Sequence, residues 1–343
     1  MKKEKKQILT IAAVYIGAII GAGLASGQEL TLFFVRFGIR GLWGAAIAGA
    51  AFAVLGALLL SRAKKMQCSS YEEYLQIIFG KKISAVFYFI VRAFLAVSFC
   101  VMLSGSGALF SEQFHLPPFS GVLLTALICF LAFCGNLKGL TAINVLLVPL
   151  MLLGMFCVCT AYLLLQARET LLAFQIGDSR FLLSVLLYVS FNMLGSAAVL
   201  VPLSKTAKTE REACLGGLLG GLALLLVIVL ACITLYLAEH TVIGQQLPIL
   251  ALSRRFSNAV SFLYALVLYM AMLTTAVANG FSALEPFVQR GKSRRKTAAL
   301  FCLASIPLSL LPFNGLIESC YTLFGFLGLL LLCAVVFDWF WNN

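Results

Sequence analysis

The sequence is poor in charged and catalytic residues. Asp, Glu, Lys and Arg make up 11% of its 343 residues, where a soluble domain carries about 25%. It has only two histidines, no Cys-x-x-Cys pair and no Walker motif. The scarcity of imidazoles and carboxylates argues against a His/Asp/Glu metal cluster. No nucleophile is paired with a histidine in the apolar segments, so the sequence does not predict an enzyme.

Apolar residues take the place of the missing charge. Hydrophobic side chains make up 62% of the chain, and the mean hydropathy is +1.03. A soluble globule cannot bury that much apolar surface, which excludes soluble enzymes, nucleic-acid binders and disordered proteins. The chain is therefore expected to be an all-α, polytopic membrane protein whose surroundings are the lipid bilayer. Its eleven cysteines lie mostly in apolar runs and are interpreted as packing residues.

Ten segments are candidates to span a bilayer, because each holds roughly 17 to 25 mainly apolar residues. They are 8–34, 41–61, 84–110, 119–135, 143–165, 181–203, 214–237, 257–281, 297–313 and 316–339. The fourth and the ninth are short.

The loops between these segments predict the orientation. Eighteen of the 25 Lys and Arg residues fall in the amino-terminal segment and the loops on its side, and six fall on the other side. Since cytoplasmic loops are enriched in Lys and Arg, both termini are expected in the cytoplasm and the protein in the cell membrane.

The two halves of the chain align at a constant offset of 173. Tyr15 falls on Tyr188, Lys81-Lys82-Ile83-Ser84 on Arg254-Arg255-Phe256-Ser257, and Ala126-Leu127-Ile128-Cys129 on Ala299-Leu300-Phe301-Cys302. We therefore expect two five-helix repeats, 1–165 and 166–343. Five spans bring the second repeat into the membrane from the opposite side, so the repeats are inverted, which is a transporter architecture.

The first and sixth spans both carry interruptions near mid-membrane. Four glycines lie within eleven positions of the first span, and each weakens a helix by about 1 kcal/mol relative to alanine. Paired interruptions at corresponding positions point to a transporter binding site, because each leaves peptide dipoles free to bind a solute. The substrate-binding candidates are Ala22, Gly23, Ser26, Asn192, Gly195 and Ser196.

The stretch from Gly17 to Glu29, GAIIGAGLASGQE, together with the 5+5 layout, resembles the YkvI family of bacterial membrane proteins. That family looks like a branch of the amino acid–polyamine–organocation superfamily, which implies a LeuT-like fold. In sodium-coupled members, carbonyls of the first span and hydroxyls of the eighth hold a sodium ion. The resemblance places such a site at Gly17, Ile20, Ala271, Thr274 and Thr275, although a threonine in a membrane helix also commonly bonds back to its own backbone.

Two charges lie inside the apolar segments. Glu29 follows the break directly and is interpreted as a proton carrier, a cation ligand or a structural cap. Arg92 lies in the third span, where it either extends to the inner surface or pairs with a carboxylate or an anionic substrate group.

Together these features predict a secondary transporter of a small organic solute, an amino acid or a related zwitterion or amine. Because no ATPase motif is present, the coupling ion is Na⁺ or H⁺, with no other cofactor expected. The alternatives are a ligand-sensing subunit of the same fold, as in germinant-receptor permeases, and a channel. The oligomeric state is left open.

Overall fold

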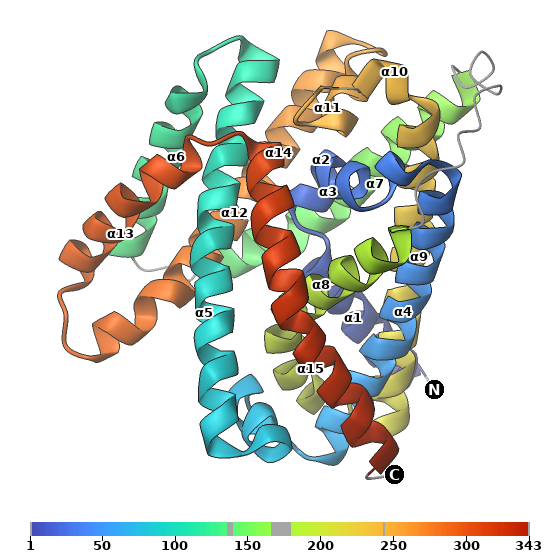
Figure 1. The fold of residues 1–343 in the computed structure, drawn as a ribbon, viewed down its shortest axis with the longest axis vertical. Coiled ribbons are helices and arrows are strands. Elements are labelled where there is room, and N and C mark those ends of the chain that lie inside the picture. The colour runs from blue at the N-terminus through green and yellow to red at the C-terminus, as the bar shows by residue number, and fades with distance from the viewer. Residues whose placement is uncertain (1, 136–139, 166–179, 243, 342–343) are drawn as a thin grey trace.

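The computed structural model describes residues 2–135, 140–165, 180–242 and 244–341, and within these ranges the secondary structure is helical, without strands. The elements are α1 (Lys2–Ile19), α2 (Ala22–Ser26), α3 (Gln28–Phe33), η1 (Val35–Phe37), α4 (Gly38–Lys65), α5 (Tyr71–Phe114), α6 (Pro118–Cys134), α7 (Leu140–Leu165), α8 (Phe181–Leu203), η3 (Ser204–Thr206), α9 (Glu210–Leu237), α10 (Glu239–Val242), α11 (Pro248–Ser253), α12 (Asn258–Gln289), α13 (Arg294–Ser309), α14 (Phe313–Leu316), η4 (Ile317–Tyr321) and α15 (Thr322–Trp341). Figure 1 shows them as one helical bundle.

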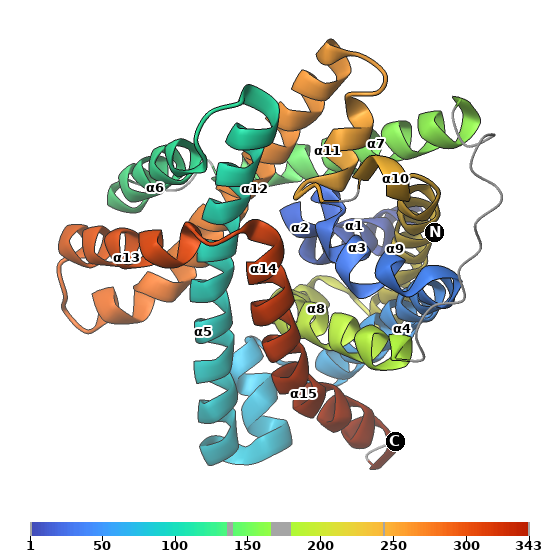
Figure 2. The same ribbon diagram turned by 45° about the horizontal axis from the view of Figure 1, so that its top comes forward.

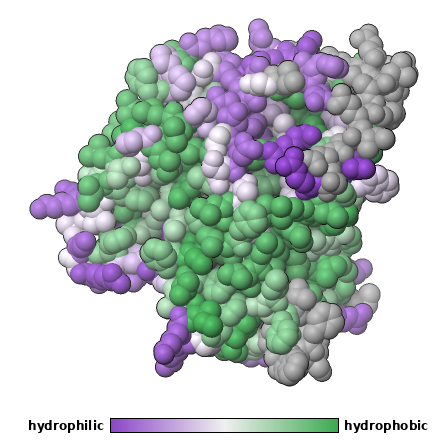
Figure 3. Space-filling model, in the orientation of Figure 1, coloured by the Kyte–Doolittle hydropathy of each residue, from purple (hydrophilic) through white to green (hydrophobic). Residues whose placement is uncertain are grey.

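The outer surface of the bundle is that of a membrane protein. Seven helical stretches of the described chain are long and apolar enough to cross a bilayer, and α6 is a shorter apolar helix of 17 residues. Large apolar side chains such as Phe89, Leu226 and Leu300 are 69–74% exposed. Figure 3 shows that apolar residues cover the middle of the face in view, while hydrophilic residues gather near its edges. These surfaces are stable when they face lipid.

The second half of the chain repeats the first. Subtracting 173 from the bounds of α9 gives 37–64, which matches α4, and subtracting it from those of α12 gives 85–116, which matches the spanning part of α5. Each of the first four spans also contacts its counterpart: α1 packs on α8, α4 on α9, α5 on α12 and α6 on α13. Contacts between equivalent helices are expected of repeats related by a two-fold axis, so the predicted 5+5 inverted repeat is confirmed. The predicted boundary at 165/166 adjoins residues 166–179, which lie outside the described residues.

Small residues bring α4 and α9 into backbone contact. A Cβ atom added to Gly221 would lie 2.2 Å from the Cα atom of Ala53, and one added to Gly217 would lie 2.6 Å from the carbonyl carbon of Gly56. Helices in membranes associate through such small-residue faces, because burial from lipid supplies little driving force. This closely packed pair lies beside the first span, because α9 also packs on α1.

The predicted interruption of the first span is confirmed. The span consists of α1, α2 and α3, with Ile20 and Gly21 outside any helix and Gly27 in the left-handed region at φ +84°. Figure 2 shows these three segments in the interior of the bundle, with α4, α8, α9 and α11 around them.

The predicted interruption of the sixth span is wrong, because α8 runs without a break from Phe181 to Leu203. Its serine and asparagine side chains bond within the helix or across to α3 and α15. Asn192 donates to the carbonyl oxygen of Tyr188 at 3.0 Å, and Ser190 donates to those of Leu187 and Gly325 at 3.0 and 2.5 Å. A single glycine, Gly195, does not disrupt a helix whose polar groups are satisfied in this way.

Two further irregularities shape the remaining spans. In α5 the backbone leaves the helical conformation at Gly80, at φ 73° and ψ 169°, so a short amphipathic helix starting at Tyr71 precedes the third span. The amide of Glu73 donates to the Ser70 hydroxyl at 3.1 Å, which caps the start of this helix. The tenth span begins as α14 and passes through the π-helical turn η4 before continuing as α15.

Candidate functional site

The gap between α1 and α2 leaves backbone polar groups free. The Ile20 amide donates to Ile16 at 2.8 Å, and the Gly21 amide donates to Ile19 at 3.0 Å. Among the described residues, no backbone amide donates to the carbonyl oxygens of Gly17, Ala18 or Ile20. A Cβ atom added to Gly21 would meet no atom within 4 Å, so there is open space beside the gap. Free carbonyl groups next to open space are suited to bind a cation or a donor group of a solute.

The end of α2 is held by a compact hydrogen-bond network. The Ser26 hydroxyl donates to the Gly23 carbonyl oxygen at 2.7 Å and accepts from the Gln28 amide at 3.2 Å. Ser26 was predicted to bind substrate, but its hydroxyl is engaged in stabilising the turn into α3. Ala22 and Gly23 are buried in the same short helix.

Glu29 lies in the first turn of α3 and is 5% exposed. A Cβ atom added to Gly23 would lie 2.0 Å from Glu29 Oε1, so only a glycine leaves room for the carboxyl group beside α2. Its other oxygen, Oε2, is buried without a hydrogen-bond partner. Within the described residues no Lys, Arg or His pairs with it. Burying an unpaired carboxylate costs several kcal/mol, so Glu29 requires a proton or a cation in this position.

An aromatic cluster packs on α3, the helix that carries Glu29. Tyr188 in α8 and Tyr321 in η4 belong to this cluster, and the ring centroid of Tyr188 lies 5.4 Å from that of Phe33 in α3. Phe191 lies between them, with its ring centroid 5.5 Å from that of Tyr188 and 4.6 Å from that of Tyr321. Phe33 stacks on Phe191 at 5.6 Å. The Tyr188 hydroxyl is buried without a partner and is therefore available to a bound solute.

The eighth span, α12, supports the broken first span. The Tyr264 hydroxyl donates to the Ala25 carbonyl oxygen at 2.5 Å. Further along α12, Ala271 and Thr274 are buried, Thr275 is partly exposed, and the Thr274 hydroxyl donates to the Ala271 carbonyl oxygen at 3.2 Å. Thr274 is thus bonded to its own helix, while Gly17 faces Val148 of α7. The sodium site at these residues stays a prediction.

The predicted residues of α8 bond within their own helix or contact α5. Asn192 bonds to its own helix, Gly195 faces the ring of Phe94 in α5, and the Ser196 hydroxyl lies 3.9 Å from the Met193 sulfur. The part of α8 that faces the broken span is instead its first half, through Tyr188 and Phe191.

Arg92 has an aromatic partner on its own helix. Its guanidinium group donates to the Tyr88 hydroxyl and lies 3.8 Å from the centroid of the Tyr88 ring. Within the described residues no carboxylate pairs with it.

The α10–α11 end of the bundle closes over the break. A Cβ atom added to Gly27 would lie 2.8 Å from the Ile249 side chain, so α11 rests on the turn between α2 and α3. Gln246 joins the end of α5 to α14. Its backbone amide donates to the Glu112 carboxylate at 2.6 Å, and its side-chain oxygen accepts from the Phe313 backbone amide at 2.7 Å. Arg254 donates to the Glu112 carbonyl oxygen at 2.5 Å.

An ion pair closes the same end between the first and last spans. Arg36 in η1 and Glu318 in η4 lie 2.9 Å apart. Both side chains are about half exposed, which places them near the bundle surface. The site around Glu29 is therefore covered from the α11 side.

Sequence reasoning did not single out several of these residues. Tyr188 had one usable signal, its alignment with Tyr15, and both tyrosines are fully buried. Tyr264, Tyr321 and the residues around Gln246 carried none, because an aromatic or amide side chain in or near an apolar helix does not reveal its partner.

Comparison with known proteins gives two relatives in sequence. The chain is 30% identical to the uncharacterized membrane protein YkvI of Bacillus subtilis, over 98% of this chain and 97% of YkvI. It is 23% identical to the uncharacterized protein YyaD of the same organism, over 94% of each chain. No family model matches the sequence.

Solved structures share the fold. The inward-facing conformation of Mhp1 superposes with a TM-score of 0.69 at 13% identity, covering 94% of this chain and 73% of Mhp1. A manganese transporter of Eremococcus coleocola, in complex with an aromatic bis-isothiourea compound, superposes with a TM-score of 0.64 at 15% identity, covering 98% and 79%. At such identities the likeness concerns the fold, which is a LeuT-like transporter fold.

Proposed function

The chain belongs to the family of the membrane protein YkvI, and from its transporter fold we propose that it is an ion-coupled secondary transporter of a small organic solute. The solute class we propose is an amino acid or a related zwitterion or amine. Transport proceeds by alternating access, in which one part of the bundle moves against the other around the broken first span. The protein lies in the cell membrane with both termini in the cytoplasm, since most of its Lys and Arg residues fall on that side.

The observation that carries this proposal is the position of Glu29. It is buried beside the gap in the first span and has no cationic side chain to neutralise it within the described residues. A group that needs a proton or a cation to be stable in the closed bundle links ion binding to the conformational equilibrium. We propose that Glu29 is the group through which the coupling ion acts.

The surroundings of Glu29 support a solute with an ammonium group. The rings of Tyr188, Phe191 and Tyr321 pack together next to α3, and cations bind favourably over aromatic rings. The free carbonyl groups of Gly17, Ala18 and Ile20 add acceptors at the gap. The unpartnered Tyr188 hydroxyl supplies a donor for a carboxylate.

The proposal is tested first by thermal stabilisation of the purified protein against amino acids, amines and other small organic ions, with and without sodium. A stabilising solute is then offered to proteoliposomes under a sodium or a proton gradient. Accumulation above the external concentration supports the transporter. Binding without net flux identifies a sensing subunit of the same fold, and flux without exchange between two labelled pools identifies a channel.

A further inference from the structure

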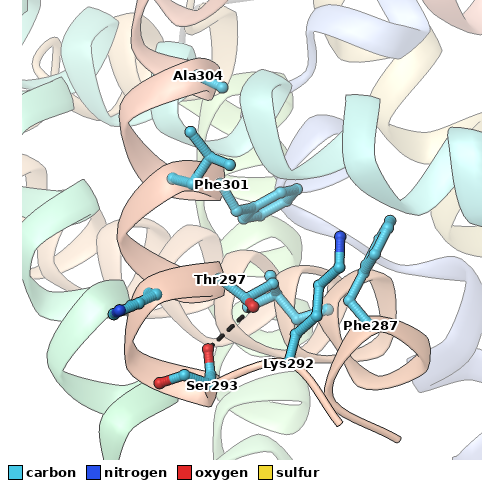
Figure 4. A pocket seen from close by; sticks show the side chains of 9 residues that line it. Phe287, Lys292, Ser293, Thr297, Phe301 and Ala304 are labelled. Atoms are coloured by element: carbon cyan, nitrogen blue, oxygen red, sulfur yellow. Dashed lines mark hydrogen bonds between the residues drawn. The ribbon is translucent and has the colours of Figure 1, made fainter. Parts of the chain in front are cut away.

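A groove of ≈ 600 Å³ lies between the end of α12 and the start of α13, away from the broken first span. Figure 4 shows Lys292 and Phe287 on one side of it and Thr297, Phe301 and Ala304 along α13 on the other. A volume in this range holds a drug-sized molecule or a lipid headgroup with part of an acyl chain.

The mouth of the groove is cationic. Lys292 and Lys296 both line it, and both are exposed. The nearby carboxylate of Glu285 is paired with Arg294 at 3.1 Å, and in the described part of the chain neither lysine has a carboxylate partner. The Lys292 ammonium lies 5.5 Å from the centroid of the Phe287 ring, which holds it at the edge of the groove.

The walls of the groove are apolar and open outward. Leu284 is buried at its base, whereas Phe287 and Leu300 are 45% and 71% exposed. Thr297, Phe301 and Ala304 lie on one face of α13 and extend over about 10 Å of helix at 1.5 Å per residue. A small anion would need only the mouth, whereas an amphipathic anion would use the whole groove.

We propose that this groove binds an anionic phospholipid, with its phosphate between Lys292 and Lys296 and an acyl chain along the α13 wall. The α12–α13 connection and the first turn of α13 carry Arg290, Lys292, Arg294, Arg295 and Lys296 without an acidic residue. Hydrophilic residues gather at this edge of the molecule beside the apolar surface, as Figure 3 shows. Basic pockets between helices at the cytoplasmic side of a bilayer bind anionic headgroups in this manner. The site does not depend on the transport function.

Lipid binding is measured by native mass spectrometry of the purified protein with phosphatidylglycerol or phosphatidylcholine. The test variant is Lys292→Ala/Lys296→Ala, and the matched control is Lys81→Ala/Lys82→Ala, which removes two exposed lysines at the start of the third span. We expect the test variant to lose about tenfold or more of the affinity for phosphatidylglycerol and the control to stay within about twofold. Leu300→Ser, which changes the wall and leaves the charge, is expected to lose affinity several-fold.

Equal phosphatidylglycerol affinity in the wild type and the test variant overturns the proposal, as does an equal loss in the test and control variants. Competition by millimolar inorganic phosphate with no effect of Leu300→Ser identifies a simple anion site and also overturns it. Equal melting temperatures of all variants in phosphatidylcholine ensure that the comparison is made on folded protein.

Discussion

The Tyr264 hydroxyl donates a 2.5 Å hydrogen bond to the carbonyl oxygen of Ala25. This bond joins the eighth span to the short helix α2 inside the broken first span, two segments separated by 239 positions in the chain. It satisfies a carbonyl group close to the turn into α3 and fixes α2 against the neighbouring helix. The interrupted part of the first span is therefore held in a defined position by the eighth span.

Replacing Tyr264 with Phe tests this support. We expect the free energy of unfolding to fall by about 1 kcal/mol, because a buried carbonyl loses its donor. Solute binding is also expected to weaken, because α2 is held less firmly against α12. Thermal unfolding in detergent and solute-induced stabilisation measure the two effects. Tyr269→Phe is the control, since that hydroxyl contacts Thr125 of α6 at 3.3 Å, away from the first span. A smaller loss of binding in Tyr264→Phe than in Tyr269→Phe would contradict this role.

One glycine in the break and one outside it allow a matched comparison. Gly23→Ala places a methyl group 2.0 Å from Glu29 Oε1 and must displace the carboxyl group, whereas Gly315→Ala in α14 adds a methyl group that meets no atom within 4 Å. We expect uptake to fall by about tenfold or more in Gly23→Ala and to remain near the wild-type rate in Gly315→Ala. Initial uptake rates in proteoliposomes with equal protein content measure the difference. Equal rates for the two variants would show that the position of Glu29 does not matter.

The predicted sodium site is tested on the eighth span. Thr274→Val/Thr275→Val removes both hydroxyl groups and preserves the shape of the side chains. If a sodium ion binds between α12 and the carbonyl groups of Gly17 and Ile20, the sodium dependence of solute-induced stabilisation is lost. Thr234→Val is a control, because this buried hydroxyl bonds to Leu230 of its own helix in α9. An unchanged sodium response in the double variant would eliminate the site.

Those parts of the fold that depend on composition and on the internal repeat could be predicted from the sequence. The apolar runs gave the spans, the offset of 173 gave the inverted repeat, and the glycines between Gly17 and Gly27 gave the break in the first span. The same reasoning was wrong for α8, because Asn192 and Ser190 are satisfied by carbonyl groups without unwinding the helix. A polar residue in an apolar segment indicates that a partner is needed and does not say which partner is used.

The candidate site was predictable only in part. Glu29 could be placed at the start of the outer half-helix, because its position in the sequence follows the last glycine. The aromatic residues around it could not, since Tyr188 and Tyr321 come from spans six and ten and meet only through long-range packing. The hydrogen bond from the Ser26 hydroxyl to Gly23 was not foreseen either, and substrate binding by Ser26 stays a prediction.

The central claim is that the coupling ion acts through Glu29, and Glu29→Gln tests it most directly. The amide keeps the shape of the side chain, so the fold is expected to be retained. Unlike a carboxylate, it does not bind and release a proton, and it carries no charge to attract a cation. The measurement is accumulation, in proteoliposomes under an imposed sodium or proton gradient, of a solute that stabilises both proteins. We predict that the wild type concentrates the solute under one of these gradients and that Glu29→Gln brings it only to equilibrium. Gradient-driven accumulation by Glu29→Gln at the wild-type level would contradict the account.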